Sequence, residues 1–186
     1  MIRNATVLAA LLAASNLTAQ YAEPPKLDKP LGVTLDGSLG YAEKEFVPAL
    51  EAMPESKFAF VPTAGEFKGV RDVAAQAKHV GAVNYWVGSV ILGEKPPVDV
   101  GKGDGPAALK EKAEVLAYLK GSYEYVHKAL KSINDRNALV AIKSPFGEGD
   151  TSRVALANIL LAHTMDHYGQ IVVYLRMNGI VPPASR

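Results

Sequence analysis

The sequence predicts an all-α protein, a bundle of four helices. Four long segments repeat apolar residues at the three- and four-residue spacing of a helix. The connections between them are long and rich in glycine and proline, and the only stretch that resembles a strand is ALVAI at residues 138–142. The chain has 186 residues, of which 48% are hydrophobic, so it has enough apolar material for one core. We therefore expect a single helical domain.

The first helix is predicted from about Thr34 to Ala52. The proline-rich segment EPPKLDKPLG before it delays its start, and Pro54 ends it. The second helix is predicted from about Lys68 to Leu92, with Gly93 as its stop signal. Because this second segment is rich in alanine and valine, we expect it at the centre of the bundle.

The third helix is predicted from Ala107 to Ile133, and it has the clearest separation of apolar and charged faces. The fourth is predicted to begin at a cap formed by Thr151 or Ser152 and to run to about Met177, before Gly179. The connections are long enough for chain crossovers rather than simple hairpins.

The first residues have the pattern of an export signal. Arg3 precedes an apolar run from Ala5 to Leu17, and small residues follow at Ala19 and Ala22, where cleavage would give a signal peptide within residues 1–22. The alternative is a membrane anchor, but the run is shorter than the roughly 20 residues that span a bilayer. We expect a periplasmic or secreted protein with no stable membrane insertion after the signal is removed.

Charge and cysteine content exclude several classes of function. Twenty basic and nineteen acidic residues give a net charge of +1, and no basic run is interleaved with aromatics, so we expect no nucleic-acid partner. The chain has no cysteine, which excludes disulfides, thiolate metal sites and iron–sulfur clusters.

Three of the four histidines lie on apolar helix stripes. His163 and His167 are four residues apart in the fourth predicted helix, so their imidazoles lie on one face about 6 Å apart at Cβ. His79 lies on the apolar stripe of the second helix, and packing of these two helices would bring the three rings together. Three imidazoles are a ligand set for a divalent metal ion.

The alternative for these histidines is a hydrogen-bonded cluster within the core. A single buried histidine usually has that role, and an HxxxH pair alone is a weak metal signal. Burying three imidazoles without partners would cost roughly 1–3 kcal/mol each, which a metal ion would avoid. Periodicity favours the metal site but leaves both alternatives open.

The segment HxxxHYGQIVVYLRMNGIVPP, from His163 to Pro183, and the segment GEFKGVRDVAAQAKHVGAVNYW resemble the DinB-like (DinB/YfiT) superfamily of four-helix metalloproteins. The resemblance extends over residues 31–183. It implies an up-up-down-down bundle in which the matching residues His79, His163 and His167 hold a divalent metal. The family also includes enzymes that use low-molecular-weight thiols in metal-dependent transfer or isomerisation.

Four residues near this pattern have less definite roles. Gln170 matches the family's GQ step and is a candidate to orient a ligand ring or a bound water, with an exposed amide as the alternative. His127 matches no family ligand and is expected at the surface or half-buried. Asp166 lies at the edge of the apolar stripe, so we expect a solvated carboxylate. Trp86 is expected to pack in the core, although it is also placed to form a pocket wall.

Three nitrogen ligands would leave coordination positions open, which is typical of a reactive site. Zn²⁺, Ni²⁺ and Fe²⁺ all accept such ligands. We expect a metal-dependent hydrolase or transferase acting on a small molecule, and a homodimer is compatible with the sequence. The alternative is a non-catalytic metal-binding or stress-related protein whose ion is structural or is the cargo. Haem is disfavoured because clustered imidazoles cannot hold both faces of a porphyrin.

Overall fold

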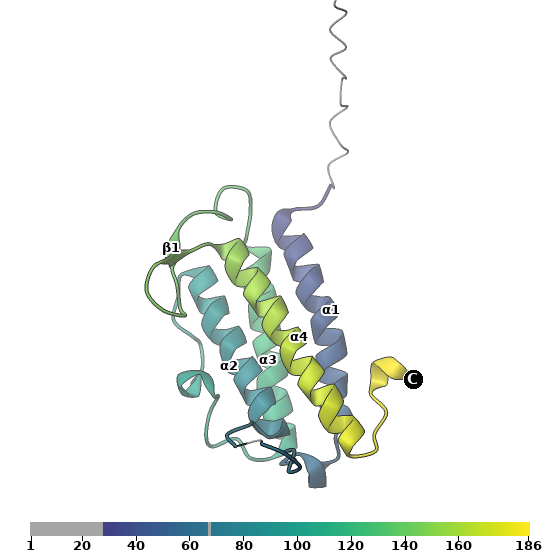
Figure 1. The fold of residues 1–186 in the computed structure, drawn as a ribbon. Coiled ribbons are helices and arrows are strands. Elements are labelled where there is room, and N and C mark those ends of the chain that lie inside the picture. The colour runs from purple at the N-terminus through teal and green to yellow at the C-terminus, as the bar shows by residue number, and fades with distance from the viewer. Residues whose placement is uncertain (1–27, 67) are drawn as a thin grey trace, which may run out of the picture.

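The computed structural model describes residues 28–66 and 68–186, and its four long helices form the predicted bundle (Figure 1). The helices are α1 (Leu31–Ala52), α2 (Val73–Leu92), α3 (Lys112–Lys131) and α4 (Arg153–Met177). Three short 3₁₀ turns, η1 (Glu55–Lys57), η2 (Gly101–Gly103) and η3 (Pro183–Ser185), lie in the connections and at the C-terminus. The predicted signal peptide falls outside the described residues.

Side-chain caps set where α2, α3 and α4 begin. Asp72 accepts a hydrogen bond from the amide of Ala75 at 2.6 Å, and Ser152 caps α4 through the amide of Ala155 at 3.2 Å. Glu111 and Glu114 form a capping box at the start of α3. The second and third helices were predicted to begin at Lys68 and Ala107, which is five residues too early in each case. The error arose because the apolar pattern also continues on the N-terminal side of the capping residue.

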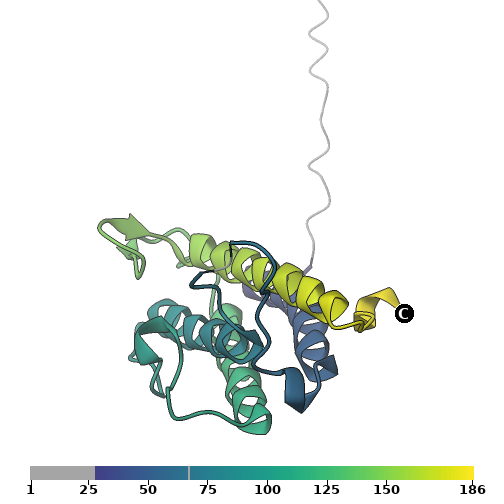
Figure 2. The same ribbon diagram turned by 60° about the horizontal axis from the view of Figure 1, so that its bottom comes forward.

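The predicted strand at residues 138–142 was largely wrong. Residues 135–139 form turns, and only Ile142 and Lys143 make the strand β1, which pairs antiparallel with β2 (Asp150–Thr151). Val154 donates its amide to the carbonyl of Ala138 at 3.3 Å, so this segment is bonded to the first turn of α4 instead of a sheet. The small hairpin projects from the end of the bundle where α4 begins (Figure 2).

The chain order of the bundle is up-down-down-up, not the up-up-down-down order that the resemblance implied. Lys112, at the start of α3, donates to the carbonyl of Glu51 at the end of α1 at 2.9 Å, so these two helices are antiparallel. By contrast, Asn84 of α2 bonds to Ser122 of α3, and Gly88 faces Tyr125 one turn later, so α2 and α3 are parallel.

The two long connections explain this order. Ala74 donates to the carbonyl of Phe58 at 3.0 Å, so the chain turns back at the end of α1 and starts α2 there. Residues 93–111 instead return along the length of the bundle before α3 begins (Figure 1). The two segments have similar lengths and compositions, so the sequence did not indicate which of them crosses over.

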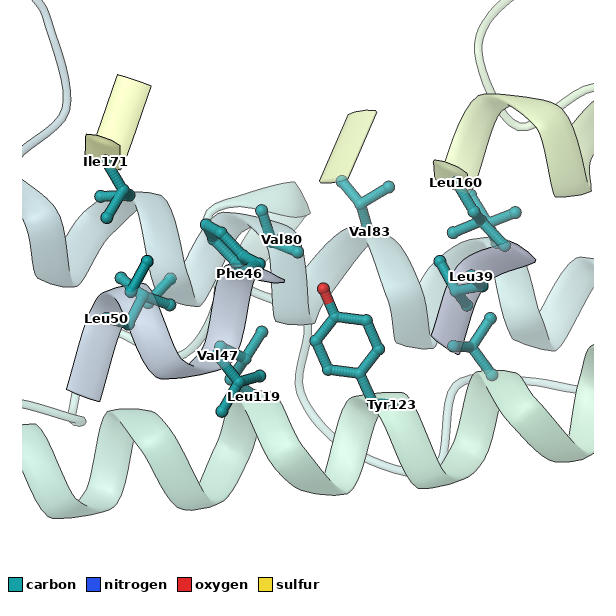
Figure 3. Close-up of a cluster of buried hydrophobic side chains, with 14 of the residues drawn as sticks. Leu39, Phe46, Val47, Leu50, Val80, Val83, Leu119, Tyr123, Leu160 and Ile171 are labelled. Atoms are coloured by element: carbon teal, nitrogen blue, oxygen red, sulfur yellow. The ribbon is translucent and has the colours of Figure 1, made fainter. Parts of the chain in front are cut away.

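All four helices contribute to the core (Figure 3). Tyr123 is fully buried and its ring points from α3 into the centre, where its hydroxyl lies 3.5 Å from Thr164 of α4. Apolar side chains surround it, and those labelled in the figure are Leu39, Phe46, Val47, Leu50, Val80, Val83, Leu119, Leu160 and Ile171. No described helix is both long and apolar enough to cross a membrane.

Candidate metal centre

The three histidines singled out in the sequence meet between α2 and α4. The ring centroids of His79 and His163 are 4.9 Å apart, those of His79 and His167 are 5.2 Å apart, and those of His163 and His167 are 4.6 Å apart. One ligand nitrogen from each ring lies within 4.8 Å of the others. The three donors therefore surround a space of the size that a single cation takes.

Local helical geometry produces this convergence. His163 and His167 are one turn apart on α4, so their rings leave the helix on the same side. α2 runs antiparallel to α4 beside this face, as shown by the hydrogen bond from Arg153 at the start of α4 to the carbonyl of Ile91 at the end of α2. His79 lies in the second turn of α2 and so reaches the rings from the opposite side.

A backbone carbonyl fixes the ring of His79. Its Nδ1 donates to the carbonyl oxygen of Gly103 in η2 at 2.6 Å. Because a carbonyl only accepts hydrogen bonds, Nδ1 carries the proton and Nε2 keeps its lone pair. The connection between α2 and α3 thus determines which nitrogen of this histidine is available as a ligand.

A buried amide has the same effect on His167. Nδ1 of His167 donates to Oε1 of Gln76 at 2.8 Å, and Gln76 has no exposed surface. Gln76 precedes His79 by one turn of α2, so one helix supplies both a candidate ligand and the orienting group for another. Nε2 of His167 is left with its lone pair.

The third ring shows why a cation fits here. Nε2 of His163 lies 3.0 Å from Nε2 of His79, whose lone pair points into the same space. Two lone pairs this close repel unless a proton or a cation lies between them. The buried Nδ1 of His163 has no hydrogen-bond partner among the described residues. A neutral His163 that donates from Nε2 to His79 still leaves its buried Nδ1 unpartnered, so hydrogen bonds within the cluster do not satisfy both nitrogens of this ring.

Burial keeps the three imidazoles neutral. Desolvation lowers the pKa of His163 to about 3, and the nearby rings of His167 and His79 add to this effect. Desolvation lowers the pKa of His167 to about 4, and it also lowers the pKa of His79, partly offset by the Gly103 carbonyl. Neutral imidazole is the form that coordinates a metal, so the rings are ready to bind at neutral pH.

A cavity of about 440 Å³ opens beside the histidines. His79 and His163 form part of its wall, so a ligand in the cavity would reach the space between the rings. The rest of its wall has four apolar side chains, three charged side chains and one glycine, namely Val83, Trp86, Phe146, Ile159, Arg71, Lys102, Asp104 and Gly103. Trp86, which we expected to pack in the core, is partly exposed in this wall.

Gln170 makes no hydrogen bond to any of the three histidine rings in the described part of the chain. Its side-chain amide donates to Asp166 at 2.9 Å on the outer side of α4, whereas Gln76 contacts His167. Asp166 is exposed, as expected from its position at the edge of the stripe. These contacts match the alternative of a helix-surface amide for Gln170, and the amide that contacts a candidate ligand ring is that of Gln76 on a different helix.

His127 lies far along α3 from this site and is half-buried. Its Nδ1 is 2.6 Å from Asp36 and its Nε2 is 2.7 Å from Glu43, both on α1. The hydrogen bond to Glu43 is the main cause that raises the pKa of His127 above its usual value. The two carboxylates favour the protonated form of His127, and the resulting contacts join α1 to α3.

Sequence reasoning missed Gln76 and Gly103. The only signal for Gln76 in the sequence was its position, since it is a polar residue in an apolar helix one turn before His79. Gly103 belongs to the segment VGKGDGP, which reads as a flexible linker. Its role follows from the crossover between α2 and α3, which places this segment against His79.

In a comparison with protein families, residues 39–171 match a family model described as the DinB superfamily. The match spans more than half of the chain and includes the three histidines. A comparison with curated proteins finds no relative.

Proposed function

The chain belongs to the DinB superfamily, and we propose that it is an exported metal-dependent hydrolase or transferase with one divalent ion at His79, His163 and His167. The superfamily is typically metal-binding, and the cluster of three neutral imidazoles is compatible with that property. The observation that carries the proposal is the cavity that opens onto His79 and His163. A structural ion would be enclosed by its ligands, whereas a reactive ion needs a free position that a substrate can reach.

The donor set limits the choice of ion. Three imidazole nitrogens without a thiolate or carboxylate suit Zn²⁺, Ni²⁺ or Fe²⁺ better than Mg²⁺ or Ca²⁺, which prefer oxygen ligands. The carbonyl of Gly103 and Oε1 of Gln76 accept hydrogen bonds from Nδ1 of His79 and His167, which keeps the proton on Nδ1 and leaves the Nε2 lone pairs available.

An ion bound there would act as a Lewis acid that activates a water or an anionic substrate. The protein's own contribution is positioning and solvation. Val83, Trp86 and Ile159 contribute apolar surface that limits water in the cavity, and Arg71 and Lys102 contribute positive charge to the same lining. Both groups line the same cavity as His79.

The second candidate is a protein whose ion is structural or is its cargo. The shared hydrogen bonds between α2 and α4 favour it, since an ion there would join two helices. Access of an external ligand to the bound ion discriminates between the two functions.

Cobalt(II) provides the test, because its visible absorption changes when its coordination changes. We expect azide added to the cobalt-loaded protein to alter the spectrum and to saturate, as an open position predicts. A spectrum that does not respond to azide would contradict the catalytic proposal and support the structural one. A cobalt-loaded Gln170→Ala variant is the control, and it should respond as the wild type does.

The proposed export rests on Arg3 and the apolar run from Ala5 to Leu17. Expression of the full chain in a Gram-negative host tests it directly. We expect the protein in the periplasmic fraction with a new N-terminus after Ala19 or Ala22. An intact Met1 in the cytoplasmic fraction would contradict export without affecting the proposed metal site.

A further inference from the structure

The charged wall of the 440 Å³ cavity carries more positive than negative charge. Its charged side chains are Arg71, Lys102 and Asp104. Arg71 donates a hydrogen bond to the carboxylate of Asp104 at 2.8 Å, and the side chain of Asp104 is 72% exposed to solvent. The cavity is therefore suited to an anion, and a divalent ion would increase this preference.

The backbone at Lys102 is the only non-glycine position with positive φ in the described part of the chain. Its φ of 56° and ψ of 27° are left-handed, and its neighbours Gly101 and Gly103 also have positive φ. A glycine would adopt this conformation without steric strain, so the lysine side chain is retained at a cost. Strain of this kind is common where a side chain has a function.

The loop that carries Lys102 is anchored on both sides. The carboxylate of Asp99 accepts the amide of Gly101 at 2.8 Å, and the amide of Gly103 donates to the carbonyl of Val100 at 2.8 Å. The carbonyl of Gly103 in turn holds His79. The backbone of Lys102 is thus held in the lining of the cavity, one residue from the carbonyl that orients a candidate ligand.

Two aromatic side chains also line this cavity. Trp86 of α2 and Phe146 of the β1–β2 hairpin meet edge to face, with ring centroids 5.5 Å apart at 68°. Phe146 is 48% exposed although it is a large apolar side chain in a short hairpin turn. An apolar ligand group that covered these two rings would bury surface that now faces solvent.

We propose that this cavity binds small amphiphilic carboxylates, with the carboxylate at Arg71 and Lys102 and an aryl or branched alkyl group against Trp86 and Phe146. The inference rests on the proposed function, since such a molecule would be the substrate class of the metal site. Arg71 already pairs with one carboxylate, that of Asp104, and its planar guanidinium suits another in its place. Amines are disfavoured because Arg71 and Lys102 would repel them, and uncharged analogues make no ion pair with Lys102.

Trp86 gives a direct reading of binding, because it is the only tryptophan of the sequence. The metal-loaded protein is titrated with phenylbutanoate, phenylbutanol, phenylbutylammonium and butanoate while its fluorescence is recorded. We expect phenylbutanoate to bind at least about tenfold more tightly than phenylbutanol, with phenylbutylammonium weakest. Butanoate should bind more weakly than phenylbutanoate because it lacks the group that covers the aromatic wall.

Substitutions assign these preferences to the two walls. Lys102→Gly removes the charge and relieves the backbone, so we expect an unchanged or higher melting temperature and a preference for carboxylate over alcohol reduced on the order of fivefold. Phe146→Ala should remove most of the advantage of phenylbutanoate over butanoate. Lys128→Gln, an exposed lysine on α3, is the matched control and should behave as the wild type.

The inference is overturned if phenylbutanol binds as tightly as phenylbutanoate, or if Lys102→Gly keeps the full preference at equal metal content. Metal content measured in the same samples separates this outcome from failure of the metal site. Bound metal without carboxylate preference contradicts only the inference. Carboxylate preference that depends on Lys102 in a protein that binds no metal contradicts only the proposed metal function.

Discussion

Oε1 of Gln76 accepts a hydrogen bond from Nδ1 of His167 at 2.8 Å, across the contact between α2 and α4. Both side chains are buried, and the amide nitrogen of Gln76 has no hydrogen-bond partner among the described residues. The amide is therefore held in place for the one bond that it makes to the histidine. This bond selects the nitrogen with which His167 faces the other two rings.

Replacement of Gln76 by alanine should weaken metal binding without removing a ligand. We expect the affinity for Zn²⁺ to fall about 10- to 100-fold, because the ring of His167 loses its orientation and its fixed tautomer. Competition with a chromogenic chelator measures this. Gln76→Glu retains an acceptor and should preserve most of the affinity. Gln170→Ala is the control, and a loss of affinity there equal to that of Gln76→Ala would contradict the assignment.

Acid should destabilise the metal-free protein through the same histidines. Burial lowers the pKa of His163 to about 3 and that of His167 to about 4, while the unfolded chain takes up these protons near 6.5. Protons therefore bind the unfolded state first, and stability is lost as the pH falls from 6.5 towards 4. In chelator, the melting temperature should fall through this window, more steeply than in a His163→Asn, His167→Asn double variant.

The metal-loaded protein should show a further loss in that window, because protonation competes with coordination. At about pH 7.5, the loaded protein should melt at a higher temperature than the chelated one, and at about pH 5 the two should coincide. Equal melting temperatures with and without chelator at both pH values would argue against a metal at this site.

His127 should have the opposite pH dependence. The hydrogen bonds to Glu43 and Asp36 raise its pKa, so the folded state holds the proton more tightly than the unfolded state does. Its contribution is fully present below about pH 6.5 and is lost as the pH rises through the raised pKa. We expect His127→Gln to cost about 1 kcal/mol at about pH 6 and less at about pH 9, measured by urea denaturation. An equal cost at both pH values would contradict an ion pair there.

Two glycines of α1 test the antiparallel packing of α1 on α3. A β-carbon at Gly32 would lie 2.5 Å from the carbonyl oxygen of Leu130, which is backbone and has little room to move, so Gly32→Ala should destabilise the fold by roughly 1–3 kcal/mol. A β-carbon at Gly37 would meet nothing within 4 Å, and Gly37→Ala should stabilise the helix by about 0.5–1 kcal/mol. Thermal denaturation measures both. A neutral Gly32→Ala would contradict the contact between these helices.

The sequence predicted the helical class and the central histidines because both depend on periodicity within one helix. The buried positions Leu39 and Phe46 in α1, and Leu156 and Ile171 in α4, follow from three- and four-residue spacing alone. The convergence of His163 and His167 likewise needs only their spacing of four residues. His79 required the packing of a second helix, and its apolar neighbours were the signal.

The rest depends on the connections, which have no periodicity. The direction of α2 relative to α1 is set where Phe58 turns the chain back, and nothing in the glycine- and proline-rich composition distinguishes this turn from a crossover. Gly103 and Lys102 belong to the crossing segment and approach His79 only after it has folded against α2. Gln76 was missed because a lone amide in an apolar helix resembles many structural polar residues.

The central claim is that His79, His163 and His167 together hold one divalent ion, and elemental analysis of the protein purified without a His tag tests it most directly. We expect about one equivalent of zinc, nickel or iron per chain in the wild type and a content near zero in His167→Ala, while His127→Ala retains the wild-type content. Folding of each variant is checked by circular dichroism. A wild-type protein that takes up no metal from excess salts, or a folded His167→Ala variant with a full equivalent, would contradict the claim.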